Sequence, residues 1–389
     1  MKRILRNCVA AAILLAAFSG HLLSQQKETA KTSSKTKNAV REWPSFSNGH
    51  EPGTWDAMIQ EDNVNIQFYG DHWSNGRNIA LSELGKLPEE NIGEFSLNRA
   101  AGKISFKGVF EDRFGHGTYT FDENTGFKNY LQQRGYTGLD KEFMMNVFFT
   151  DISKGYFDFM VANGYNEITN SEFKDLVEQN MNQKLMADYF DLIKTEGYGH
   201  QSLGKLVELR EHGVRPDFIR GFEQMGYKKI TLDQALDLRD HGVTPKFVTE
   251  IRSMGYPDIS LDKAQDLRDH GVTPKFVNEM KAMGYGDISL DRAQELRDHG
   301  VNPEYIKSMQ AMGYKNITLE KAQELRDHGV NPAFISGIQK LGFKDISLDK
   351  AQELRDHGVS VAYIQKVKAK GLANITTLDD YIKLKDTGF

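Results

Sequence analysis

The chain has 389 residues, of which 26% are charged and 39% are hydrophobic, and its formal net charge is −5 at pH 7. This mild negative balance argues against a nucleic-acid-binding surface, which is typically strongly basic. The chain has one cysteine, Cys8, so no intrachain disulfide can form, and packed side chains must supply the stability of a chain long enough for two domains.

The N-terminus has the pattern of a secretory signal peptide. Three basic residues, Lys2, Arg3 and Arg6, precede the apolar run Val9–Phe18. That run is too short to span a bilayer as a helix. We therefore expect residues 1–24 to be a signal peptide and the protein to be exported, either to a periplasm or to the medium.

Residues 25–52 are expected to be a flexible linker. They are polar, rich in Lys, Thr and Ser, and lack an apolar period, as is typical of chains that do not fold alone. An interaction tail is the alternative interpretation. After cleavage of the signal peptide we expect no transmembrane segment.

Residues 53–128 are predicted to form a small antiparallel β domain of four or five strands. Hydrophobic and polar residues alternate there, which favours half-buried strands, and glycines at 102, 115 and 117 are expected in the hairpin turns. One face of such a sheet needs cover, and the helices expected near Phe127–Val147 would supply it. The strand segments are Val64–Tyr69, Phe95–Leu97, Ile104–Phe110 and Thr118–Phe121, with a short helix or loop at Leu81–Leu87.

The rest of the chain is built around a repeated string, R-(D/E)-H-G-V. It occurs six times at intervals of 29 residues. A fixed period of this size indicates a repeat array. The repeated histidines and glycines, which we interpret as structural, are His212, His241, His270, His299, His328 and His357, and Gly213, Gly242, Gly271, Gly300, Gly329 and Gly358.

Each repeat is predicted to be a pair of short helices. In one unit Ser260 is placed to cap the first helix and Gly271 to end it, while Thr273-Pro274 opens the second helix and Gly284 closes it. Helices of roughly 10 residues are not stable alone, so the units must stack. The predicted fold is therefore α+β: the β domain followed by an α-helical solenoid over 129–389, with clear repeats at 202–372 and degenerate capping units at both ends.

The histidine of each repeat is interpreted as the last helical residue, hydrogen-bonded to the terminal carbonyls of its helix. A row of pH-sensing imidazoles is the alternative. Histidines about 10 Å apart cannot share one metal ion, and the sequence has no HExxH or paired CxxC motif. We therefore expect no metal site.

The arginine and acidic residue of each string have two interpretations. The first is ion pairing between the arginine of one repeat and the aspartate of the next, which would fix register. The second is a charged stripe that a partner binds, as extended solenoid faces do. The candidate partner-binding residues are Arg210, Arg239, Arg268, Arg297, Arg326 and Arg355, with Asp240, Asp269, Asp298, Asp327 and Asp356.

No catalytic constellation is apparent. The pair Asp71-His72 has no nucleophilic serine or cysteine motif at a recognisable spacing, and the glycines around His116 lack the strand–loop–helix context of a phosphate site. The aromatic residue early in each second helix, such as Phe247, is expected in the core. We expect neither an enzyme nor a cofactor.

Three segments together resemble a bacterial extracytoplasmic module: His72-Trp73-Ser74, the stretch Gly102–Phe121, and units of the form L-R-D-H-G-V-x-P-x-F/Y-V/I…M-G-Y. That module is similar to the C-terminal region of antirepressor-type zinc metallopeptidase sensors, membrane proteins related to β-lactam sensors, and to stand-alone exported proteins. The resemblance covers Trp55 to the C-terminus. The peptidase part is missing, so no catalytic residue is carried over. The resemblance implies a sensory or interaction module of the cell envelope.

The expected function is that of a non-enzymatic exported scaffold in envelope sensing or stress signalling, which binds an envelope protein or peptide through the solenoid face. A structural protein associated with cell-wall glycan is the alternative, and an enzyme built on the β domain is a third possibility. The sequence leaves the oligomeric state open.

Overall fold

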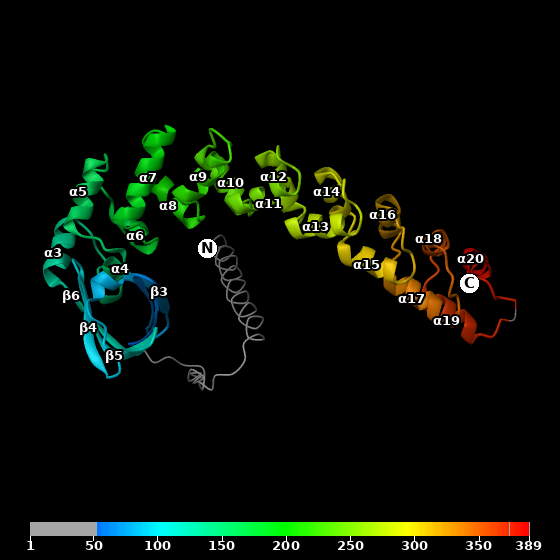
Figure 1. The fold of residues 1–389 in the computed structure, drawn as a ribbon, viewed down its shortest axis with the longest axis horizontal. Helices are drawn as coiled ribbons and strands as arrows, with labels where there is room; N and C mark the ends of the chain where they lie inside the picture. The colour runs from blue at the N-terminus through cyan, green and yellow to red at the C-terminus, as the bar shows by residue number, and fades with distance from the viewer. Residues whose placement is uncertain (1–52, 373, 389) are drawn as a thin grey trace.

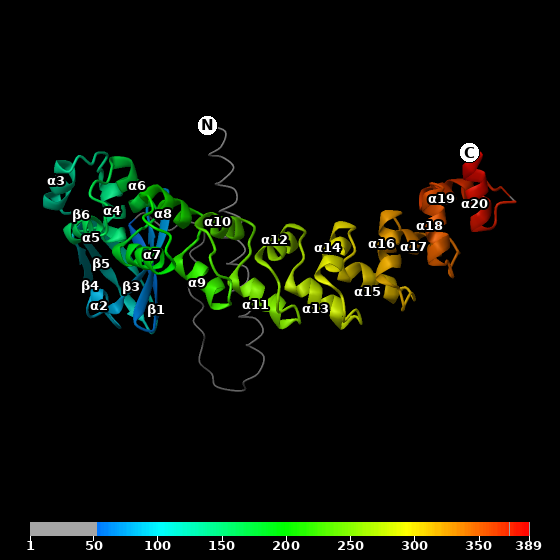
Figure 2. The ribbon, with the colours of Figure 1, turned by 90° about the horizontal axis from the view of Figure 1, so that it is seen from above.

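A computed structural model describes residues 53–372 and 374–388. The predicted signal peptide and linker, residues 1–24 and 25–52, lie outside this part. A β-sheet stands at one end and the helices extend from it as a long curved array (Figures 1 and 2). In the described part, no helix has the length and apolar character needed to span a membrane. The fold is α+β with a helical repeat array, as predicted.

The sheet has six strands rather than four or five, and all neighbours are antiparallel, in the order β3-β2-β1-β6-β5-β4. Strands β1 and β3 were not predicted because their alternation is weak: β3, SNGRNIA, buries only Ile79, and β1, TWDAMIQ, buries only Trp55 and Ala57. The elements are β1 (Thr54–Gln60), β2 (Asn63–Tyr69), β3 (Ser74–Ala80), α2 (Leu81–Leu84), β4 (Gly93–Arg99), β5 (Gly102–Glu111) and β6 (Phe114–Glu123).

The glycines at 115 and 117 lie within β6 and not in a hairpin turn, so that prediction is wrong. A Cβ on Gly117 would lie 2.1 Å from the carbonyl oxygen of Lys107, and one on Gly115 would lie 2.4 Å from the ring of Phe110. These positions are glycine because the neighbouring strand and its aromatic ring approach too closely for any side chain.

The helices follow from α3, which begins at Thr125, so the helical part starts earlier than the predicted residue 129. The irregular N-terminal helices are α3 (Thr125–Gln133), α4 (Lys141–Thr150), α5 (Lys154–Ala162), α6 (Asn170–Glu178) and α7 (Gln183–Glu196). The first helices of the repeats are α8 (Leu203–Glu211), α10 (Leu232–Asp240), α12 (Leu261–Asp269), α14 (Leu290–Asp298), α16 (Leu319–Asp327), α18 (Leu348–Asp356) and α20 (Leu378–Asp386). The second helices are α9 (Pro216–Gln224), α11 (Pro245–Ser253), α13 (Pro274–Ala282), α15 (Pro303–Ala311), α17 (Pro332–Lys340) and α19 (Val361–Ala369).

Local capping explains why every repeat helix has the same length. The Ser260 side chain accepts from the amide of Lys263 at the start of α12, and the Thr273 side chain accepts from the amide of Phe276 at the start of α13. Gly271 follows the C-cap His270 with φ of +69°, a left-handed conformation that glycine adopts without strain. Each helix therefore starts and stops at a residue that the sequence specifies.

The helices stack in two rows that share one core. First helices contact the first helices of neighbouring repeats, for example α18 and α20. Second helices contact one another in the same way along the array, from the pair α7 and α9 to the pair α17 and α19. Each repeat buries the same apolar positions, for example Leu267, Val272, Phe276 and Val277. The predicted last, incomplete unit is present as α20, which closes the row of first helices.

The sheet docks on the first row through α4. The ring of Phe68 lies 4.9 Å from that of Phe149, and Phe121 lies 5.4 Å from Phe148. Arg99, at the end of β4, donates to the carbonyl oxygens of Phe148 and Phe149, both at 3.1 Å. The helices thus cover one face of the sheet, as the sequence analysis expected.

Candidate functional site

The histidines pair with the aspartate of the next repeat. His241 Nδ1 lies 2.5 Å from Asp269 Oδ1, and His270 Nδ1 lies 2.5 Å from Asp298 Oδ1. The prediction that these side chains bond the terminal carbonyls of their own helix is therefore wrong, because the ring projects across the repeat boundary. The other pairs are His212–Asp240 at 2.7 Å, His299–Asp327 at 2.6 Å, His328–Asp356 at 2.5 Å and His357–Asp386 at 2.8 Å.

The predicted pairing of arginine with aspartate is also wrong, because histidine occupies the aspartate. Each arginine instead lies over the aromatic ring of the preceding repeat: the Arg268 Cζ is 5.4 Å from the centre of the Phe247 ring. The same contact recurs for Arg239 on Phe218 (5.5 Å), Arg297 on Phe276 (5.6 Å), Arg326 on Tyr305 (5.3 Å) and Arg355 on Phe334 (5.2 Å), and Lys385 lies 4.9 Å from the Tyr363 ring.

The glycine of the string makes room for this arginine. A Cβ on Gly242 would lie 2.7 Å from Arg268 Nη2, and one on Gly271 would lie 2.9 Å from Arg297 Nη2. The glycine therefore has two reasons to be present, its positive φ and the close approach of the guanidinium. Arg210, the first of the series, differs: its Nε donates to the carbonyl oxygen of Gln179.

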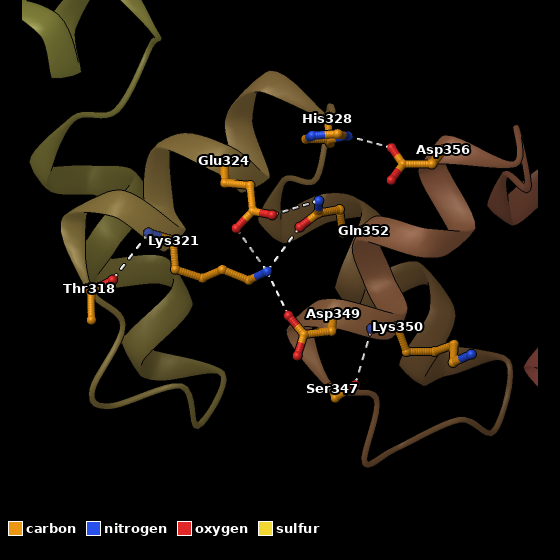
Figure 3. Close-up of polar contacts among 9 residues, drawn as sticks. All are labelled: Thr318, Lys321, Glu324, His328, Ser347, Asp349, Lys350, Gln352 and Asp356. Atoms are coloured by element: carbon orange, nitrogen blue, oxygen red, sulfur yellow. Dashed lines mark hydrogen bonds and ion pairs between the residues drawn. The ribbon is translucent and has the colours of Figure 1, made fainter.

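A third network, which was not predicted from the sequence, crosses five of the boundaries between first helices. The boundary between α10 and α12 lacks it because Gln234 occupies the position of the cation. Lys321 Nζ lies 2.6 Å from Asp349 Oδ1 and 3.1 Å from Glu324 Oε2, and it donates to Gln352 Oε1 (Figure 3). Gln352 in turn donates to Glu324 at 2.9 Å. The repeated L-(D/E)-K/R-A-Q-E string was the available signal, since it places a cation, an amide and a carboxylate on one helix face. The equivalent cations are Lys205, Lys263, Arg292 and Lys350.

The tyrosines of the Gly-Tyr pairs join the loops of successive repeats. The hydroxyl of Tyr285 donates to the carbonyl oxygen of Ile317 at 2.7 Å. The same bond joins Tyr198 to Ile230, Tyr227 to Ile259, Tyr256 to Ile288 and Tyr314 to Ile346. Burial raises the pKa of Tyr198 to about 12, so its hydroxyl remains a protonated donor at neutral pH.

These contacts leave the arginines as the unpaired cations of the repeated string. We define the arginine row as Arg239, Arg268, Arg297, Arg326 and Arg355. No ion pair joins any of the five to a described carboxylate, whereas the histidine, aspartate and lysine positions are paired across repeat boundaries. Four of the five are exposed and Arg297 is half-buried. Each guanidinium is thus held on a ring with solvent beside it.

A second candidate site is a cavity of about 720 Å³ where β3 meets the ends of α4 and α7. Its lining includes Arg77, Arg99, Asp151, Asn180 and Lys184. The lining does not include Asp71, His72 or His116, the residues over which an enzyme built on the β domain would need a pocket. Within residues 53–372 and 374–388, no cluster of three histidine, cysteine or acidic side chains could hold a metal ion.

No protein-family model matches this chain, and no curated protein matches its sequence.

Proposed function

We propose that this protein is an exported, non-enzymatic scaffold that binds an extended acidic segment of an envelope protein along the arginine row. The observation that carries the proposal is the contrast within each repeat. Histidine, aspartate, lysine and glutamate are used between repeats, while the arginines have a ring on one side and no carboxylate partner in the described structure.

Stacking prepares these arginines for binding. A guanidinium held on a ring has lost much of its rotamer freedom before a ligand arrives, and it can still present N–H groups to a carboxylate in a bidentate geometry. Arg268 and Arg297 lie over Phe247 and Phe276, one repeat apart. With helices about 10 Å apart, five such groups span roughly 40 Å, the length of about 12 extended residues.

Export and an envelope partner rest on the sequence, namely the signal-peptide pattern of residues 1–24 and the resemblance of Trp55 onward to an extracytoplasmic module. Association with cell-wall glycan remains the second candidate. A neutral glycan has no carboxylates for the arginines, so binding to wall material would not depend on their charge.

The test is capture from envelope extract by crosslinking, with the full chain and three variants. In the first variant four arginines of the row, at 239, 268, 297 and 326, become glutamine. In the second the same four become lysine, which the chain itself uses over the Tyr363 ring. In the third, four exposed lysines outside the row, Lys246, Lys275, Lys315 and Lys344, become glutamine, which matches the charge change of the first.

The proposal predicts a protein partner captured by the wild type, the lysine variant and the surface-lysine variant, and lost in the glutamine variant. Circular dichroism of each variant establishes that it is folded. Equal capture by all four proteins would contradict the proposal. Co-sedimentation of all four with cell-wall material, with no protein captured, would favour the glycan-binding alternative.

A further inference from the structure

The cavity at the junction of sheet and helices has features of a second binding site, separate from the arginine row. Its volume of about 720 Å³ is within the range of small-molecule sites. One wall is the edge strand β3, and the others are the C-terminal end of α4 and the N-terminal turn of α7. Residues distant in the sequence, such as Arg77, Phe149 and Lys184, therefore line one space.

Of the two arginines in this cavity, Arg99 is occupied by the protein. It donates to the last carbonyls of α4 and to Glu83, with Nη2 2.9 Å from Glu83 Oε2, and its Nε lies 3.8 Å from Asp151 Oδ1. Its contacts join the sheet to the helices. Arg99 therefore has a structural role and is not available to a ligand.

Arg77 is different. Its Cζ lies 4.9 Å from the centre of the Phe149 ring, and its Nε is buried without a hydrogen-bond partner in the described structure. Burial, and then the positive charge of Arg99, lower the pKa of Arg77. An arginine stays protonated in proteins nonetheless, and a half-buried cation without a counter-charge is unfavourable. An anion in the cavity would relieve this cost.

Two further polar groups of the cavity could contact a ligand beside Arg77. Lys184 lies in the first turn of the 14-residue helix α7, where Asn182 caps the amide of Leu185 and where the helix dipole favours an anion. The Oδ1 atom of Asn180, in contrast, is a buried acceptor, also without a hydrogen-bond partner among the described residues. Besides the carboxylates of Glu83 and Asp151, which pair with Arg99, the cavity thus holds the cations Arg77 and Lys184 and a carbonyl acceptor without a donor.

We propose that this cavity binds a small carboxylate that also carries an N–H donor, such as an acylated amino acid or the C-terminal residue of a peptide. Arg77 and Lys184 face the carboxylate, and Asn180 Oδ1 accepts from the N–H group. The apolar wall of Ile79, Phe149 and Ala187 takes the side chain of the ligand.

Saturation-transfer NMR on the full chain tests this with four probes: N-acetylalanine, acetate, N-acetylalaninamide and inorganic phosphate. N-acetylalanine has both the carboxylate and the N–H group, acetate has the carboxylate alone, the amide has no charge, and phosphate has charge without an N–H donor. We expect N-acetylalanine to bind most tightly and acetate more weakly. Failure of N-acetylalanine to bind, or equally tight binding of phosphate or of the amide, would overturn the proposed ligand class.

Arg77→Met separates binding from folding. Methionine keeps an apolar stem on the Phe149 ring and removes the unpaired charge, so thermal stability should be unchanged or higher, while affinity for N-acetylalanine falls about tenfold or more. Asn180→Gly, which suits the positive φ of 50° at that position, should weaken the binding of N-acetylalanine and leave the binding of acetate unchanged. Arg215→Met, at an exposed arginine outside the cavity, is the control.

A structural role alone would give the reverse pattern for Arg77→Met, with lower thermal stability and unchanged binding of N-acetylalanine. That result would refute the site. These measurements do not depend on the arginine row. A failure of N-acetylalanine to bind would therefore leave the proposed scaffold function standing, and a failure of the arginine row to bind a partner would leave the cavity proposal standing.

Discussion

Substitution of Gly271 by alanine tests whether the arginine contact, and not φ alone, requires glycine in the repeated string. Gly271 has φ of +69°, and a Cβ there would lie 2.9 Å from Arg297 Nη2. Gly358 has the same φ of +69°, but its Cβ would meet only Lys385 Cε at 3.6 Å, an ordinary contact distance. Alanine would therefore suffer the same backbone strain at both positions, but only at Gly271 would its Cβ also clash with an arginine side chain.

The magnitudes follow from these distances. Placing alanine in the left-handed region costs about 1 kcal/mol at either position. At Gly271 the guanidinium of Arg297 must also move off the Phe276 ring, which forfeits a cation–π contact of about 0.5–1 kcal/mol. We expect Gly271→Ala to lower the free energy of unfolding by about 1.5–2 kcal/mol and Gly358→Ala by about 1 kcal/mol.

Urea unfolding followed by circular dichroism measures both values, and a double-mutant cycle isolates the contact. Arg297→Lys places at this boundary the side chain that the protein has at Lys385. In that background Gly271→Ala should cost only about 1 kcal/mol, the backbone term alone. An equal cost of Gly271→Ala in both backgrounds would show that the arginine contact is irrelevant, and would refute the reasoning.

Three further predictions concern the contacts between repeats. Tyr285→Phe removes the hydrogen bond to the Ile317 carbonyl and should lower the free energy of unfolding by about 1 kcal/mol; no change in urea unfolding would contradict the role of this bond. Phe343 occupies the equivalent tyrosine position directly after α17, so Phe343→Tyr should add a bond of the same kind and slow amide hydrogen exchange in α20; unchanged exchange would show that the bond does not form. The hydrogen bond to Asp386 raises the pKa of His357, so its contribution to the docking of α20 should be complete below about pH 6.5, the usual pKa of histidine, and be lost as pH rises through the raised value. NMR titration of the His357 ring measures this pKa, and a pKa at or below the usual value would contradict the pairing.

The helical array could be predicted in detail because its signals are local and repeated. A capping hydroxyl such as Ser260, a proline such as Pro274 and a glycine such as Gly271 specify where each helix starts and stops. The period then requires stacking, since one helix pair cannot bury its own apolar face.

The partners of the repeated charges could not be predicted from spacing. Arg268, Asp269 and His270 are consecutive, so the period places all three equally near the next unit. Only the directions of the side chains decide that His270 meets Asp298 while Arg268 turns back to Phe247. Strands β1 and β3 were missed for a similar reason, since neighbouring strands determine which of their residues are buried.

The junction cavity has no sequence signal at all. Arg77, Phe149 and the pair Asn180 and Lys184 belong to three separate segments with no common spacing. They meet because α4 packs on the sheet and because α7 starts beside the end of α4, which is a property of the tertiary structure.

Fluorescence anisotropy with labelled oligoglutamate peptides of 4, 12 and 20 residues measures whether the arginine row binds acidic segments. We expect the affinity of the wild type to rise between peptides of 4 and about 12 residues, the length that spans the row, and to weaken with salt. The affinity should be retained with lysine at 239, 268, 297 and 326, and should fall at least about tenfold with glutamine there. Equal affinity of the glutamine variant and the wild type, or no binding at low salt, would contradict the proposed function.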